Sequence, residues 1–203
     1  MLLRFLLAWV GVMGFVWHAN ADDSVARDTV VAVVDAFKTE IVEKKAVLKQ
    51  DEVALRKAVR EVISPVIDFA DLSKKVMGKY YLRATDEQRE RFAVVTEQTL
   101  LKTYGASMLD FDPSKINVLP EVRPNRNDTV WVDTEFYTDA GAAVNVAFLM
   151  EQIEGRWWLS NVVINNINFG LTFRKQFGLM VQKSRNDLDE AITAWEASLA
   201  QGQ

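Results

Sequence analysis

Hydrophobic and polar side chains alternate with a period of two in the second half of the chain. Residues 144–150 carry Val, Phe or Met at every second position, which is typical of a β-strand. Glu154-Gly155 offers a tight turn, and residues 157–167 return with aromatic and β-branched side chains. Apolar residues also occupy the expected solvent side of this hairpin: Ala147, Leu149, Trp157 and Val163. A sheet that is apolar on both faces has to be covered on both.

Two further strands are predicted before this hairpin. Residues 115–122 have strand character, a polar turn follows at residues 124–128, and residues 130–136 alternate again. Residues 139–141, Asp-Ala-Gly, form a second short loop. Four consecutive strands joined by short links predict an antiparallel meander.

Elsewhere the hydrophobic period is that of an α-helix. Stripes of apolar residues, with capping residues before several of them, predict these helices: residues 24–48, 51–64, 68–78, 86–109, 170–181 and 186–199. The clearest boundary is a capping box of Thr85 and Gln88. We therefore expect an α+β fold, with a helical part over residues 24–110 and 170–200 and a curved four-stranded sheet over residues 115–169.

The N-terminus is expected to be removed from the mature protein. Arg4 precedes an apolar run over residues 5–17, and residues 19–21, Ala-Asn-Ala, form a small-x-small cleavage site. This pattern is typical of a secretory signal peptide cleaved after about Ala21. The alternative is a membrane anchor, but the apolar run is too short to span a bilayer. The sequence predicts one exported, soluble domain over residues 22–203.

Composition excludes several kinds of chemistry. The chain has no cysteine, and its single histidine, His18, lies in the predicted signal peptide. Ser-His-Asp and Cys-His catalysis and the usual zinc sites therefore have no ligands or bases, and we predict no metal site. The net charge of −4 argues against a nucleic-acid partner. Any reaction would have to use carboxylates, Tyr, Lys or Arg.

An apolar cavity between the sheet and the long helix is the first candidate site. Its predicted lining comes from the helix at residues 86–109, from one face of the sheet, and from aromatic residues after it: Leu100, Leu101, Tyr104, Met108, Val146, Phe148, Val163, Ile167, Phe169 and Phe173. The alternative is an ordinary packed core, because apolar stripes usually pack against one another.

Charged residues give weaker candidates. Asp133 and Glu135 share one strand face and could divide acid and base roles, although a solvated face explains them equally well. Glu97 lies within an apolar helix face, where it either extends to solvent or pairs with a base, or else acts as a catalytic acid. Arg174 and Lys175 could contact an anionic head group, or they could complement a helix dipole.

Two stretches of the chain match the motifs of a known family. Residues 77–92, MGKYYLRATDEQRERF, together with LLKTYG at residues 100–105, resemble the pattern "LGxYW..ATxEQ..RF…L..TYG". Residues 163–177, VINNINFGLTFRKQF, are similar to the segment "I.GVSL…YR..F". Both motifs resemble those of the toluene-tolerance family, whose members are periplasmic phospholipid-binding proteins. The chain departs from the pattern at Asn166, Asn168 and Phe173, where the family has Gly, Ser and Tyr.

The resemblance implies a carrier in the Mla system, which maintains lipid asymmetry of the outer membrane and tolerance of organic solvents. Such a carrier receives phospholipid from an outer-membrane lipoprotein–porin complex and delivers it to an inner-membrane ABC transporter. The resemblance also implies a nuclear-transport-factor-like sheet beside a helical part, with acyl chains between them. Phospholipid would be the cargo, with no cofactor and no enzymatic reaction.

Two alternatives remain open at this point. One is a cavity isomerase or dehydratase on a similar sheet, using Asp133, Glu135 or Glu97 as acid or base. The other is a periplasmic chaperone for lipoproteins, which also needs an exported apolar cavity.

Overall fold

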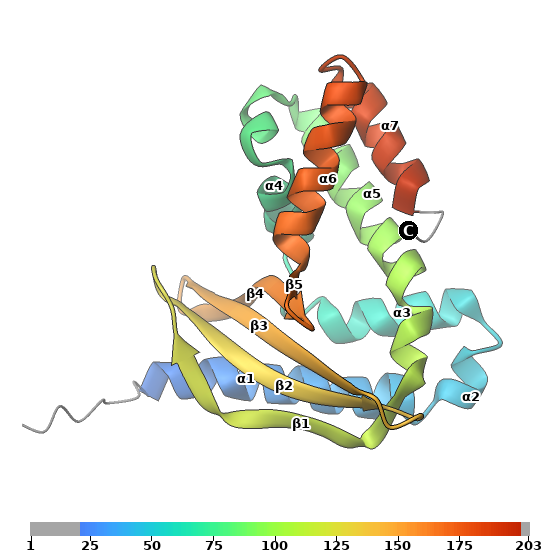
Figure 1. Cartoon of the computed structure of the whole chain (residues 1–203), viewed down its shortest axis with the longest axis vertical. Coiled ribbons are helices and arrows are strands. Elements are labelled where there is room, and N and C mark those ends of the chain that lie inside the picture. Colours follow the sequence, from blue (N-terminus) through green and yellow to red (C-terminus); the bar gives the residue numbers. More distant parts are fainter. Residues whose placement is uncertain (1–20, 200–203) are drawn as a thin grey trace, which may run out of the picture.

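The computed structural model describes residues 21–199 of the chain, so the predicted signal peptide lies outside the described residues except for Ala21. Helical segments precede and follow the strands (Figure 1): α1 (Ala21–Phe37), η1 (Lys38–Val42), α2 (Lys45–Leu48), α3 (Glu52–Ile63), α4 (Phe69–Met77), η2 (Gly78–Arg83), α5 (Asp86–Tyr104), η3 (Ala106–Asp110), α6 (Phe169–Lys183) and α7 (Leu188–Leu199). Within residues 21–199, every helix is too short or too polar to span a bilayer.

Several helix starts follow directly from capping side chains. The carboxylate of Asp51 accepts from two backbone N–H groups at the start of α3, and Asp68 does the same for α4. Thr85 and Gln88 form the predicted capping box at the start of α5. These caps confirm the boundaries expected from the sequence.

The predicted continuous helix over residues 24–48 was wrong. After Phe37 the backbone changes to π-helical bonding in η1, where Glu43 N–H donates to the Lys38 carbonyl at 2.9 Å. This change allows the adjacent side chains Ile41 and Val42 to be buried together. The 3.6-residue period of an α-helix does not predict that two adjacent side chains are both buried.

The strands form an antiparallel sheet in chain order: β1 (Phe111–Pro124), β2 (Thr129–Thr138), β3 (Ala143–Ile153), β4 (Arg156–Ile164) and β5 (Ile167–Asn168). The four predicted strands are confirmed, and the two-residue β5 is added to them.

Asn165 and Asn166 make the turn into β5 with φ values of 46° and 67°. Asparagine tolerates this left-handed geometry, so Asn166 can stand where the family often has glycine.

A β-bulge in β4 decides which side chains face the core. Leu159 pairs with Met150 and Asn161 pairs with Leu149, which leaves Ser160 as an extra residue. The bulge places Trp157 on the opposite face from Val163, although simple alternation puts both on one face. The expectation that Trp157 lies on the solvent side was therefore wrong, because its side chain is only 5% exposed.

Helix α1 lies along one face of the sheet (Figure 1) and closes a first apolar cluster. We call it the sheet cluster; its fully buried members are Ala26, Val30, Val34, Ile116, Val130, Val132, Phe136, Val146, Met150 and Trp157. Phe148, Leu159 and Val162 pack beside it and are only partly buried. The sheet thus offers more apolar surface than α1 covers.

Two further clusters form the helical part. Helices α4 to α7 form a separate layer (Figure 1), and its core, the helical cluster, includes Phe92, Phe177 and Trp195 with no exposed surface. The third, the α3 cluster, joins α3 to η1, η3 and the end of α5 through Leu55, Val59 and other side chains. Helix α3 therefore lies between the sheet layer and the layer formed by α4 to α7.

Candidate functional site

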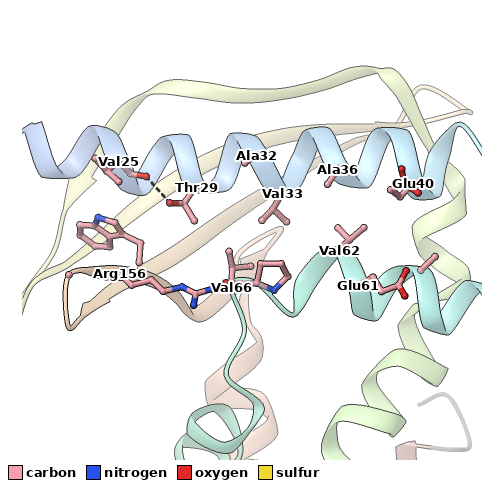
Figure 2. A pocket seen from close by; sticks show the side chains of 14 residues that line it. Val25, Thr29, Ala32, Val33, Ala36, Glu40, Glu61, Val62, Val66 and Arg156 are labelled. Carbon is pink, nitrogen blue, oxygen red and sulfur yellow. Dashed lines mark hydrogen bonds between the residues drawn. The ribbon is translucent and has the colours of Figure 1, made fainter.

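A groove of about 580 Å³ runs between α1 and α3 and ends at the start of β4. We call it the α1–α3 groove. Its described lining comes from both helices, the segment after α3 and the β3–β4 hairpin: Val25, Thr29, Ala32, Val33, Ala36, Glu40, Ala58, Glu61, Val62, Pro65, Val66, Gly155, Arg156 and Trp157. Figure 2 shows the side chains of the two helices facing each other across it.

The lining is apolar in the middle and charged at its ends. Alanines and valines of α1 and α3 face each other along its length (Figure 2), and the alanines leave space that longer side chains would fill. Glu40 and Glu61 lie at one end, and Arg156 lies at the other. The groove can therefore hold an apolar chain and has opposite charges at its two ends.

The Arg156 end is built by a tight turn. Glu154 and Gly155 have φ values of 52° and 75°, as in the two-residue hairpin turns that match strand twist. The Arg156 guanidinium donates to the Pro65 carbonyl and lies 4.1 Å from the centre of the Trp158 ring. Trp157 follows directly and is buried in the sheet cluster.

The α1–α3 groove lies between two of the apolar clusters. Trp157 belongs to the sheet cluster, whereas Val33, Ala58 and Val62 belong to the α3 cluster. An apolar ligand in the groove would therefore contact both clusters.

The predicted lipid-binding residues are divided among several places. Leu101 and Met108 belong to the α3 cluster, and Val146 and Phe148 belong to the sheet cluster, so these four share clusters with the groove lining. Four others pack in or against the helical cluster: Leu100, Tyr104, Phe169 and Phe173. Val163 lies on the outer side of the sheet. Ile167 is 56% exposed. None of these residues is in the described lining of the groove.

The aromatic residues among them form a packed set inside the helical layer. The Tyr104 ring lies 5.9 Å from Phe169 and 6.4 Å from Phe173, and the two phenylalanine rings are 5.5 Å apart. Burial raises the pKa of the Tyr104 hydroxyl. These contacts hold α5 and α6 together.

The candidate carboxylates have basic partners. Asp133 accepts from the Arg123 guanidinium at 2.5 and 2.7 Å, in a hollow of about 490 Å³ on the outer side of the sheet. Hydrogen bonding to Asp133 outweighs partial burial and raises the pKa of Arg123. Glu97 lies 2.6 Å from Arg60 Nε, which confirms the expectation that it pairs with a base. Among the described residues, no group of acidic side chains could hold a metal ion.

The predicted head-group residues lie away from the groove. Arg174 Nε donates to the Lys75 carbonyl at 2.7 Å, and its stem packs beside Gly78 at the end of α4. Lys175 is exposed on α6. The basic residue that lines the groove, Arg156, was not identified from the sequence; its place directly after the Glu154-Gly155 turn was the available indication.

Comparison with known proteins identifies the family. The family model described as MlaC protein matches residues 31–197. The chain belongs to the MlaC family. A curated relative, the toluene tolerance protein ttg2D of Pseudomonas putida, is 31% identical over 185 residues, covering 89% of this chain and 86% of that protein. The intermembrane phospholipid transport system binding protein MlaC of Haemophilus influenzae is 22% identical, covering 82% and 78%.

A solved structure supports the same fold. The phospholipid-binding protein from Ralstonia solanacearum, determined in complex with a phospholipid, matches with a TM-score of 0.76 and 20% identity over 87% of this chain and 97% of that one. The expected α+β fold and the resemblance to the toluene-tolerance family are thus confirmed.

Proposed function

We propose that this MlaC-family protein is a periplasmic phospholipid carrier, not an enzyme. It would shuttle lipid between an outer-membrane lipoprotein–porin complex and an inner-membrane ABC transporter. The observation that carries this proposal is the α1–α3 groove, an apolar space between two cores with opposite charges at its ends. The names of the two curated relatives and the lipid-bound structural neighbour support it. The signal-peptide pattern at residues 1–21 supports export.

The energetics explain why a carrier needs such a groove. Each methylene moved out of water contributes roughly 0.8 kcal/mol, so the approximately 30 methylenes of two acyl chains amount to more than about 20 kcal/mol. A bilayer already provides this stabilisation. The carrier must match most of it by apolar burial, with few polar contacts, if it is both to hold the lipid and to release it.

The acyl chains would extend from the groove along both adjoining clusters. The groove volume of about 580 Å³ falls within the roughly 300–1,000 Å³ of small-molecule sites. Partly buried side chains such as Phe148 and Met108 pack against the two clusters that adjoin the groove. We expect these side chains to move apart and enlarge the space when lipid enters, because they are not locked in a fully buried core.

Native mass spectrometry of the protein purified from bacteria tests the proposal. We expect a bound mass equal to a phospholipid, and Val33→Glu should fold but lose it, because a charge in the groove opposes acyl chains. Ile167→Glu is the matched control: Ile167 is 56% exposed and lies outside the described lining, so this variant should keep its lipid.

Three outcomes would contradict the proposal in different ways. A lipid-free mass for the whole wild-type population would argue against a phospholipid carrier. Loss of lipid in Ile167→Glu but not in Val33→Glu would place the cargo away from the groove. A bound acylated peptide in place of phospholipid would favour the lipoprotein chaperone.

A further inference from the structure

One polar atom of the α1–α3 groove lining has no partner among the described residues. The indole Nε1–H of Trp157 is buried and makes no hydrogen bond. The other fully buried tryptophan in the described chain behaves differently, because Trp195 Nε1 donates to Thr96 Oγ1 at 3.2 Å. A buried indole N–H normally finds an acceptor, since leaving it unpaired destabilises the folded state. An acceptor supplied by a ligand would satisfy Trp157.

The neighbouring residue supplies a positive charge at the mouth of the groove. Arg156 is the only basic residue in the described lining, and it has no carboxylate partner among the described residues. It is held by the Pro65 carbonyl and the Trp158 ring, neither of which neutralises its charge. An anion is therefore favoured at this end. At the other end of the groove (Figure 2), Glu40 and Glu61 form ion pairs with Lys44 and Lys57, so that end offers an anion no unpaired basic group of the groove lining.

We propose that Arg156 and Trp157 together anchor the polar part of a phospholipid. This inference rests on the proposed carrier function. The exposed Arg156 would bind the phosphate, which stays in water, and the buried Trp157 Nε1–H would donate to an ester carbonyl deeper in the groove. The order of the two residues in depth matches the order of phosphate, ester and acyl chain in a glycerophospholipid. The tails then run between α1 and α3 toward Glu40 and Glu61.

The ester contact can be tested on the wild-type protein with two lipids that differ only in their linkage. A diacyl phospholipid has carbonyl acceptors, whereas its dialkyl ether analogue has none. After removal of the bound lipid, we expect the diacyl lipid to bind roughly three- to tenfold more tightly, the range of one hydrogen bond. Equal affinity for the two lipids would overturn the role of Trp157 while leaving the carrier function intact.

The matched variant is Trp157→Phe, which keeps an aromatic ring but removes the N–H donor together with part of the ring area. Because the smaller ring affects both lipids alike, the readout is the ratio of the two affinities, and this variant should bind the diacyl and dialkyl lipids equally. Trp131→Phe, on the outer side of the sheet, is the control and should retain the preference for the ester. A preference for the ester that survives in Trp157→Phe would show that another donor makes the contact. Failure of the wild-type protein to bind either lipid would overturn the carrier function itself.

The phosphate contact has a separate test. Arg156→Gln should lower affinity for phospholipid roughly three- to tenfold and leave affinity for diacylglycerol, which lacks the phosphate, unchanged. Its effect should shrink as salt is added, because the guanidinium is exposed. Arg126→Gln, in the exposed β1–β2 turn, should change neither affinity. If Arg156→Gln lowered the affinity for phospholipid and for diacylglycerol equally, Arg156 would act only through the structure of the hairpin.

Discussion

Trp195 is the largest fully buried side chain in the described part of the chain. Its ring lies between 5.7 and 6.0 Å from the rings of Phe92, Phe173 and Phe177, and so joins α5, α6 and α7. Because Trp195 lies on α7 and contacts rings of both α5 and α6, movement of a single helix cannot fill the space that its side chain occupies. The stability of the helical layer therefore depends strongly on this position.

We expect Trp195→Ala to lower the free energy of unfolding by about 3–5 kcal/mol, the usual cost of a large cavity. Thr96→Val is the milder companion change, because it leaves the indole N–H of Trp195 without its acceptor and should cost about 1–3 kcal/mol. Denaturant unfolding followed by circular dichroism measures both. A smaller loss in Trp195→Ala than in Thr96→Val would contradict this account of the helical core.

Single residues also show where sequence reasoning stops. The apolar surroundings of Glu97 in the sequence indicated that it needs a base, and the structure supplies Arg60. The sequence could not name this partner, because Arg60 lies in another helix and only packing brings it near. The same holds for Arg156: the turn before it was predicted, but the groove beside it exists only once α3 lies against α1.

At the scale of elements, the junction of β4, β5 and α6 is held by two asparagines. Asn161 Oδ1 accepts from the backbone N–H of Gly170 at 3.0 Å, and its Nδ2 donates to Asn168 Oδ1 at the same distance. Asn168 in turn caps α6 by accepting from Leu171 N–H. Asparagine thus serves as the cap where the family has serine.

Two glycines of α6 should respond in opposite ways to alanine. A Cβ at Gly170 would lie 2.6 Å from Asn161 Oδ1, which its hydrogen bonds hold in place, so Gly170→Ala should destabilise by about 1–3 kcal/mol. At Gly178 the nearest atom, in Tyr80, is 3.8 Å away, and Gly178→Ala should stabilise the helix by about 0.5–1 kcal/mol. Thermal unfolding of both variants is the measurement. Stabilisation by both changes would show that Asn161 moves freely.

Elements were predictable to the extent that local chemistry defines them. Asp51, Asp68 and Thr85 marked helix starts because a capping side chain acts on its own backbone within three residues. The bulge at Ser160 was missed because register depends on the partner strand. Most of the residues predicted to line one cavity lie in three separate clusters for a similar reason. The sequence shows apolar faces on α5 and on the sheet, but it does not show which surfaces these faces pack against.

At the scale of the molecule, Lys75 joins the helical layer to the sheet. Its Nζ lies 2.6 Å from Asp71 on its own helix, 2.6 Å from Glu151 on β3 and 2.8 Å from Ser160 on β4. Burial favours the neutral amine, but hydrogen bonds to Asp71 and Glu151 outweigh it and raise the pKa of Lys75. The hydrogen bond from Lys75 lowers the pKa of Glu151 in turn.

This junction should make stability depend on pH in the acid range. Because the folded pKa of Glu151 lies below its ordinary value of 4.5, its contribution is complete above pH 4.5 and is lost as the pH falls through the folded pKa. Wild type should therefore be more stable than Glu151→Gln at pH 7, by about 1 kcal/mol for a partly exposed pair, and the difference should vanish in acid. Unfolding free energies at a series of pH values test this.

The control for that experiment is Glu154→Gln, which removes an exposed carboxylate that has no ion-pair partner among the described residues. This substitution should change the free energy of unfolding only slightly at neutral pH. A difference between wild type and Glu151→Gln that stays constant down to the lowest pH would mean that the Lys75 bridge does not join the two layers.

The extra residue at Ser160 has a consequence for how this family can diversify. Deleting Ser160 would make Leu159 and Asn161 consecutive, so the strand would alternate regularly and Trp157 would keep the face it now occupies. What would change is the local bend and twist that a bulge gives to a strand. In this architecture, the loss or gain of one strand residue can therefore reshape the space beside β4 while the side chains that line it stay the same.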